Sequence, residues 1–172
     1  VHSVDDLNRL KEIGLVENTA LFPHGIPHFE SQVKPAAKES MPVIATYGFC
    51  LPHKGLVELV QAVYELKQRG FLVKLRLVNA EYPNPESANL IYDINQLIDS
   101  LQIKDQVEFN SHYLENEDSF ALLNEADFLI FAYQHTGESS SAAVIFGLAT
   151  RKPILVSPLP IFEDLGDSVF RL

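Results

Sequence analysis

The sequence predicts an α/β fold in which a parallel β-sheet is covered by helices on both faces. Two observations lead to this prediction. Short apolar runs typical of buried strands alternate with longer segments in which apolar residues recur every three or four positions. This alternation repeats along the chain, and strand–helix–strand order implies parallel strands joined by right-handed crossovers. With 172 residues, of which 47% are hydrophobic, the chain is long enough for one such domain and a short additional segment.

The first 41 residues precede the regular alternation. Ser3 and Asp6 form a helix-capping pattern, which predicts a helix that continues to about Ile13. Residues 20–22 are predicted to form a strand. Residues 26–41 contain prolines and charges without periodicity and are therefore predicted to be a linker.

The main domain is predicted to span residues 42–172, and residues 1–41 are assigned to the end of a preceding domain and a linker. Its predicted strands are residues 43–47, 72–78, 107–109, 128–131 and 154–156. Apolar stripes predict helices within residues 56–66, 90–101 and 120–126, and an apolar run predicts another at 142–149. Because the chain begins with Val1 and ends in strand-like residues, we expect it to be a fragment of a longer protein.

The overall charge disfavours two classes of partner. There are 13 Lys and Arg against 23 Asp and Glu, a net charge of -10, which repels nucleic acids and anionic membranes at long range. No leader or long apolar span is visible, so we expect a cytoplasmic location. The single cysteine, Cys50, excludes an internal disulfide and is interpreted as a spacer rather than a nucleophile.

Ligands of parallel α/β sheets bind beyond the carboxyl ends of the strands, and two loops stand there. In the first loop, residues 47–55, Gly48 allows close backbone approach and Lys54 can bring a charge to a phosphate. The spacing matches neither a Walker A loop nor a G-x-G-x-x-G fingerprint, which disfavours an ATPase or a dehydrogenase. The alternative is a solvated lysine before a helix that starts with glycine.

The second loop, residues 137–141, reads G-E-S-S-S and connects a predicted strand to an apolar helix. Serines at a helix start can cap free N–H groups, and the positive end of the helix dipole favours phosphate. Glu138 is suited to sugar hydroxyls, although a glutamate there can also simply stabilise the helix dipole, by about 0.3–1 kcal/mol. Together the two loops favour one shared ligand, a sugar that carries phosphate.

Five segments of the chain resemble the C-terminal donor domain of retaining GT-B glycosyltransferases of family 4, also called group 1. The similar segments, in order, are residues 48–55, 107–109, 124–127, 138–149 and 153–157. They are similar to the family's G-R-L-x-x-x-K-G loop, V-x-F strand, x-x-A-D helix end, E-x7-E-A-x-A segment and P-V-V-x-S strand. The resemblance extends from about Pro42 to the end of the chain.

The resemblance implies a Rossmann-like domain, the C-terminal half of a GT-B fold, that binds a nucleotide-diphosphate sugar. It also implies a hexosyltransferase that works with retention of configuration, as in polysaccharide biosynthesis. The acceptor, a polysaccharide, a lipid-linked glycan or another glycan, would be brought by an N-terminal domain absent from this sequence, and the fragment alone is expected to be inactive. Neither a metal ion nor another cofactor is expected.

The resemblance also implies roles for individual residues. Lys54 would contact the diphosphate and Glu138 the donor sugar, so both are expected to be catalytic. Tyr113 would stack on the nucleobase, with packing on its own loop as the alternative, and backbone N–H groups of the three serines would hold phosphate or sugar. The complete set of predicted binding residues is Gly48, Lys54, Gly55, Tyr113, Glu138, Ser139, Ser140 and Ser141.

Two positions depart from the family pattern. Phe49 stands where the family has an arginine, and Phe146 stands where it has a second glutamate. These departures leave two alternatives open: a GT-B-like binding or assembly module without catalysis, and a domain that binds another phosphorylated metabolite. His24 either borders the cleft or belongs to a plain turn, and His135 is close enough in sequence to Glu138 to reach a sugar.

Overall fold

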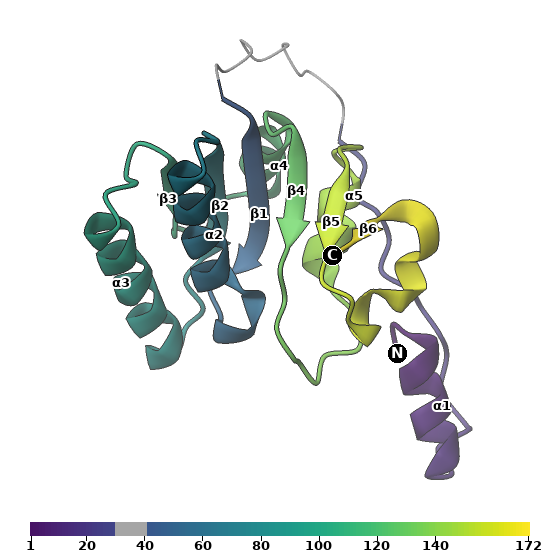
Figure 1. Ribbon diagram of the computed structural model, residues 1–172. Coiled ribbons are helices and arrows are strands. Elements are labelled where there is room, and N and C mark those ends of the chain that lie inside the picture. The colour runs from purple at the N-terminus through teal and green to yellow at the C-terminus, as the bar shows by residue number, and fades with distance from the viewer. Residues whose placement is uncertain (30–40) are drawn as a thin grey trace.

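The computed structural model describes residues 1–29 and 41–172. Its centre is a six-stranded sheet in which every pairing is parallel, and the strand order is β3-β2-β1-β4-β5-β6 (Figure 1). The strands are β1 (Val43–Phe49), β2 (Lys74–Ala80), β3 (Val107–Asn110), β4 (Phe128–Phe131), β5 (Ile154–Val156) and β6 (Phe170–Arg171). The predicted α/β class is confirmed.

Helices cover both faces of this sheet, as predicted. The α-helices are α1 (Val4–Glu12), α2 (Leu56–Gln68), α3 (Pro85–Ser100), α4 (Asn116–Asn124) and α5 (Ala142–Leu148), and two 3₁₀ segments are η1 (Pro52–Lys54) and η2 (Pro160–Ser168). Helices α2 and α3 lie on one face, and α4 and α5 lie on the other (Figure 1). No helix within residues 1–29 and 41–172 is both long and apolar enough to cross a membrane.

Each face of the sheet has its own apolar core. Val60 of α2 and Ile94 of α3 are fully buried against Leu75 of β2. On the opposite face, Leu123 of α4 is packed in one cluster with Phe131 of β4. The apolar stripes of the sequence therefore mark the sides of the helices that contact the sheet.

The strand order reverses between β1 and β4. From β1 the chain adds β2 and β3 on one side, and from β4 it adds β5 and β6 on the other. Asp127 ties the two central strands together, because its Oδ2 accepts a hydrogen bond of 2.8 Å from the backbone N–H of Val43. Such a reversal opens a crevice beyond the strands' carboxyl ends, where ligands of this fold class bind.

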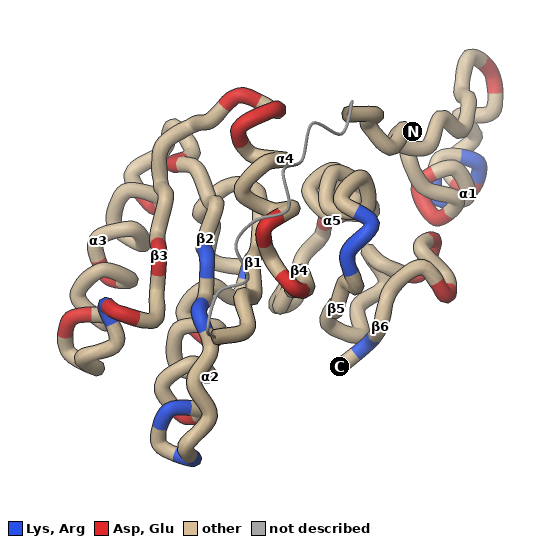
Figure 2. The backbone as a smooth tube through the Cα atoms, turned by 90° about the horizontal axis from the view of Figure 1, so that it is seen from above, with Lys and Arg blue, Asp and Glu red and all other residues tan. Residues whose placement is uncertain are grey.

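A buried cation supports the outer part of the sheet. The Arg76 side chain on β2 is 5% exposed and pairs with Glu108 at 3.0 Å and with Glu125 at 2.8 Å. Figure 2 shows the basic segments of β2 beside the acidic segment of β3. The carboxylates and the carbonyl oxygen of Leu122 compensate the cost of burying the guanidinium.

The predicted helix at the N-terminus is confirmed as α1, whose first turn is capped by a hydrogen bond from the backbone N–H of Asp6 to Ser3 Oγ. The predicted strand at residues 20–22 is wrong. The backbone N–H of Phe22 donates to the Val1 carbonyl at 2.8 Å, and the amino group of Val1 donates to Ala20 at 3.0 Å. These bonds join two very short extended pieces, which is too little for a strand ladder.

Most of the predicted linker, residues 30–40, lies outside the described residues. Just before it, Phe29 packs against the main domain: its ring stacks on Phe120 at 4.2 Å between centroids and meets the edge of Phe146 at 5.4 Å. The division at residue 41 stays a prediction.

Candidate functional site

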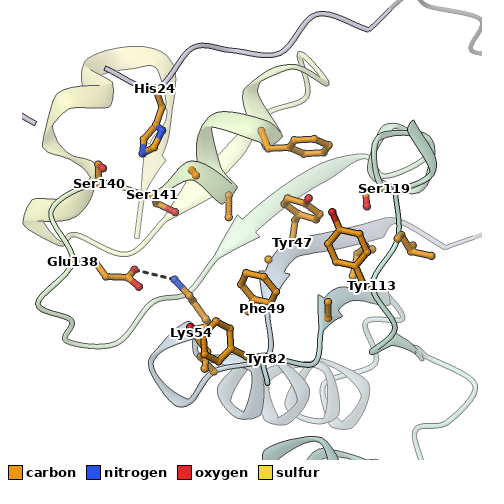
Figure 3. A pocket seen from close by; sticks show the side chains of 18 of the residues that line it. His24, Tyr47, Phe49, Lys54, Tyr82, Tyr113, Ser119, Glu138, Ser140 and Ser141 are labelled. Carbon is orange, nitrogen blue, oxygen red and sulfur yellow. Dashed lines mark hydrogen bonds and ion pairs between the residues drawn. The ribbon is translucent and has the colours of Figure 1, made fainter. Parts of the chain in front are cut away.

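A cavity of about 520 Å³ opens at the carboxyl end of β1 and extends toward α5 (Figure 3). We call it the switch-point cavity. It is lined by His24, Tyr47, Gly48, Phe49, Leu51, Lys54, Val78, Ala80, Tyr82, His112, Tyr113, Leu114, Ser119, Glu138, Ser140, Ser141, Ala142, Ala143 and Phe146. Both loops singled out in the sequence contribute residues to the lining of this cavity.

Two glycines let the first loop pass close to its neighbours. Gly55 has φ +70, and a Cβ added there would lie 1.9 Å from the carbonyl oxygen of Ala132, so no other residue fits without movement of the backbone. Gly48 has φ +132, and a Cβ there would lie 3.3 Å from the Cβ of Ala143. The tight passage at Gly55 fixes the 3₁₀ turn that carries Lys54.

Lys54 and Glu138, the two predicted catalytic residues, meet in the cavity. Lys54 Nζ donates a hydrogen bond of 3.0 Å to Glu138 Oε2 (Figure 3). The same Nζ lies 4.0 Å from the centroid of the Tyr133 ring, a cation–π contact. The lysine side chain is 9% exposed and the glutamate side chain 44%, so the buried cation faces a carboxylate that is open to the cavity.

His53 is a third charged or polar neighbour at this point. Its Nε2 lies 3.5 Å from Glu138 Oε1, which is longer than an ordinary hydrogen bond, and this buried nitrogen makes no other polar contact that qualifies as one within the described residues. Burial, and next the Lys54 cation, lower the pKa of His53 from its ordinary value of 6.5, while Glu138 and Glu86 act in the opposite direction. The imidazole is therefore neutral at pH 7 in this arrangement.

The three serines have different positions. Ser141 caps α5 as predicted, since its Oγ accepts from the backbone N–H of Val144 at 3.4 Å, and it also bonds Tyr133 OH at 3.0 Å. Ser140 and Ser141 line the cavity, whereas Ser139 does not; its hydroxyl donates to the carboxylate of Asp6 in α1. The roles predicted for the backbone N–H groups stay predictions.

Aromatic rings form the side of the cavity opposite the serines. Tyr113, predicted to stack on a nucleobase, lines the cavity and is 70% exposed. Phe49 meets Tyr82 edge-on at 5.2 Å, and Tyr47 stacks on Phe146 at 4.4 Å. Both phenylalanines that depart from the family pattern are thus cavity residues. Burial raises the pKa of Tyr47, so its hydroxyl stays protonated.

The N-terminal segment also reaches the site. His24 lines the switch-point cavity, which favours the interpretation that it borders the cleft. Its ring stacks on His2 at 4.1 Å, and burial followed by the proximity of His2 lowers the pKa of His24. A second cavity of about 300 Å³ shares His24, Ser140 and Ser141 with the first. Residues 1–29 therefore contribute to the walls of both.

Sequence reasoning missed the roles of His53, Tyr82 and Tyr133. His53 adjoins Lys54, so its position next to the lysine was the available signal. Tyr133 is the second residue after β4, but no pattern in the sequence indicates a cation above its ring. Cys50 agrees with its interpretation as a spacer, because it is fully buried and burial raises its pKa to about 12. Within residues 1–29 and 41–172, no group of three or more His, Cys, Asp and Glu side chains is arranged to hold a metal ion.

No model of a known protein family matches the sequence, and neither does any curated protein. Solved structures, in contrast, match the fold. A glycosyltransferase from Rickettsia africae is 15% identical with a TM-score of 0.63, and the match covers 99% of this chain and 38% of that one. HepE from Anabaena, solved in complex with UDP-glucose, is 16% identical with a TM-score of 0.63 over 99% of this chain and 39% of its own.

A third match concerns a single domain. The C-terminal domain of LpcC, a group 1 glycosyltransferase from Francisella tularensis, is 12% identical with a TM-score of 0.61, and the match covers 77% of this chain and 69% of that one. The chain spans about two fifths of the length of the first two structures. It therefore has a Rossmann-like α/β fold of the kind found in GT-B glycosyltransferases.

Proposed function

We propose that the switch-point cavity binds a nucleotide-diphosphate sugar and that the chain is the donor-binding half of a retaining hexosyltransferase of family 4. One observation carries the proposal. Lys54 and Glu138 come from loops after adjacent parallel strands, β1 and β4, and meet at 3.0 Å in a cavity of about 520 Å³. A cation and a carboxylate at this point match the two chemical parts of such a donor.

The two side chains would contact different parts of the donor. Lys54 would turn from Glu138 to the diphosphate and stabilise the charge that develops on the leaving group. Glu138, the more exposed partner, would accept hydrogen bonds from the sugar hydroxyls. The fold of HepE, solved with UDP-glucose, supports a donor of this class.

The proposal extends to the protein that contains this chain. We propose that an acceptor-binding domain supplies the glycan or lipid-linked acceptor from the other side of the cleft, and that the protein acts in the cytoplasm in polysaccharide biosynthesis. Lys54 and the start of α5 supply the positive charge for the diphosphate, so binding is expected without a metal ion. Titrations in the presence of EDTA and of Mg²⁺ should give the same affinity.

Calorimetric titration of the chain with UDP, GDP and ADP, and then with their sugar conjugates, tests the proposal. One nucleotide should bind saturably, and Lys54→Ala should weaken its affinity about tenfold or more, because a hydrogen-bonded charge contact is lost. Glu138→Ala should leave the affinity for that nucleoside diphosphate within about threefold and remove the preference for its sugar conjugate.

Lys104→Ala is the matched control, since this lysine is 84% exposed on the surface and pairs only loosely with Asp99 at 3.8 Å. It should change none of the affinities. A nucleotide affinity that survives Lys54→Ala unchanged would place the phosphates elsewhere and contradict the proposal. Loss of all binding with Glu138→Ala would contradict the division of roles.

The two cavity phenylalanines favour a second candidate, a binding or assembly module of the same fold without catalysis. Phe49, 41% exposed, and Phe146 offer no hydrogen bond to phosphate or ribose. Phe49→Arg in the same titration separates the candidates. At a donor site the new guanidinium should strengthen diphosphate binding, whereas a module that has lost this chemistry should not respond.

A further inference from the structure

His53 has a half-buried imidazole that the proposed division of roles does not use. Its Nε2 is 3.5 Å from Glu138 Oε1, while the other oxygen of the same carboxylate accepts the hydrogen bond from Lys54 at 3.0 Å. The carboxylate therefore lies between two nitrogen atoms, Lys54 Nζ at hydrogen-bonding distance and His53 Nε2 at the outer limit of that distance. The buried Nε2 has no other hydrogen-bond partner among the described residues.

The backbone keeps His53 next to the loop that carries Glu138. The backbone N–H of Gln134, in the β4–α5 loop, donates to the carbonyl of His53 at 2.8 Å. The rings of His53 and Tyr133 meet edge to face at 6.1 Å between centroids. The imidazole thus stays near Glu138 when the Lys54 side chain turns away.

We propose that His53 is a positioning residue. It hydrogen-bonds the Glu138 carboxylate in place of Lys54 when Lys54 turns to the phosphates of a bound donor. This inference rests on the proposed function. When a diphosphate draws Lys54 away, Glu138, 44% exposed, loses its bonded partner and is free to turn into solvent. A shift of a few tenths of an ångström shortens the distance between His53 Nε2 and Oε1 to that of an ordinary hydrogen bond, so the sugar-binding carboxylate keeps its place.

The charges around His53 support this exchange. It is faced by Lys54 of η1, Glu138 of the β4–α5 loop and Glu86 of α3, with the ring of Tyr133 beside it. In the free protein burial and Lys54 lower the pKa of His53, and the two carboxylates oppose them. An anion that draws Lys54 away weakens the influence of the cation, so the pKa of His53 should rise and binding should take up a proton at pH values between the pKa of the free and of the bound protein.

The first test needs no ligand. NMR titration of the imidazole signals is compared for wild type, Glu138→Gln, Lys54→Met and Lys54→Met/Glu138→Gln, and the His53 signal is assigned by its loss in His53→Gln. The pKa of His53 should rise in Lys54→Met, and Glu138→Gln should lower it more in the Lys54→Met background than in wild type, because the freed carboxylate then bonds the imidazole. The same effect of Glu138→Gln in both backgrounds, or no rise in Lys54→Met, overturns the inference.

The second test uses UDP and UDP-glucose as probes. His53→Phe should reduce the preference for UDP-glucose over UDP by about tenfold, the size expected for loss of a charge-assisted contact, and affect UDP itself much less. His53→Gln, which keeps an N–H donor but does not titrate, should restore most of the preference and abolish proton uptake. An equal loss of UDP and UDP-glucose affinity in His53→Phe, or no rescue by His53→Gln, contradicts the positioning role.

The two proposals fail differently. If wild type binds none of the nucleotides, the proposed function is wrong, and the titrations in the free protein still decide whether His53 takes over Glu138. If the nucleotide binds and depends on Lys54 while both histidine tests fail, the donor site stands and the role of His53 is wrong.

Discussion

Gly55 determines how closely the lysine-bearing turn approaches the strand next to it. Its left-handed backbone directs the chain from η1 into α2, and its missing side chain leaves room for the carbonyl of Ala132 just after β4. Lys54 immediately precedes it. The position of the cavity's cation therefore depends on a residue that has no polar group to contribute.

Gly55→Ala should destabilise the protein strongly. Its Cβ would lie 1.9 Å from a backbone oxygen, which adds overpacking of about 1–3 kcal/mol to the cost of a left-handed alanine. Gly70→Ala is the matched control, because Gly70 has φ +84 with nothing within 4 Å of the added Cβ. Chemical denaturation measures both, and equal losses of unfolding free energy would refute the steric argument.

The sequence identified Lys54 and Glu138 but not the contact between them. Both were recognised because polar residues followed apolar strands. Their contact depends on the pairing of β1 with β4, and strand order cannot be read from residue types. His53 and Tyr133 were missed because their contacts with this pair arise from the 3₁₀ turn and from the passage at Gly55.

One serine of helix α3 makes hydrogen bonds to two loops of the candidate site. Ser87 is fully buried, and its hydroxyl donates to the carbonyl of Cys50 at 2.7 Å and accepts from the backbone N–H of Tyr82 at 2.9 Å. Cys50 belongs to the lysine-bearing loop and Tyr82 to the aromatic side of the cavity. The first turn of α3 therefore connects the two walls.

Ser87→Ala should lower the unfolding free energy by about 1–3 kcal/mol, because a buried carbonyl and a partly buried N–H lose their partner. Ser100→Ala, at the exposed end of the same helix, removes a hydrogen bond of 2.8 Å to the Leu97 carbonyl and should change stability by no more than about 0.5 kcal/mol. Thermal and chemical unfolding check both. If the two variants were equally stable, Ser87 would not connect the loops as argued.

The regular elements followed from the sequence wherever apolar periodicity was strong. The predicted strands and helices of residues 42–156 all form, with small differences at their ends; β2, for example, begins at Lys74 and not at residue 72. The strand-like residues at the end of the chain form β6, which has only two residues and pairs with β5, whereas η2 was not predicted. The false strand at residues 20–22 had apolar residues but no neighbouring strand long enough to pair with.

The two histidines with lowered pKa values give the whole molecule a pH-dependent stability. The pKa values of His53 and His24 lie below the ordinary 6.5 in the folded protein, so the unfolded chain binds protons first as pH falls. Their contribution to stability is complete above 6.5 and is lost as pH falls through the lower, folded values. We expect the unfolding free energy to decrease with falling pH in this range.

A double variant, His24→Gln with His53→Gln, measures this contribution. Its unfolding free energy, followed by denaturation between about pH 5 and 8, should vary less steeply with pH than that of wild type. Repeating the series at high salt removes most of the repulsion within a chain of net charge -10, which also changes with pH. Identical slopes in both proteins would show that the histidines do not control the pH dependence.

The pairing of β1 with β4 determines at which point of translation the candidate site can form. Lys54 and Glu138 are separated by 84 positions, as are Val43 and Asp127 at the base of the same two strands. A nascent chain that has just released β1, β2 and β3 from the ribosome has half a sheet and a lysine without its carboxylate. Such long separations slow folding, because loop closure precedes the contacts that reward it. The candidate site therefore cannot form before the loop that follows β4 has been synthesised, and a ligand that needs both Lys54 and Glu138 recognises only chains whose translation has passed this loop.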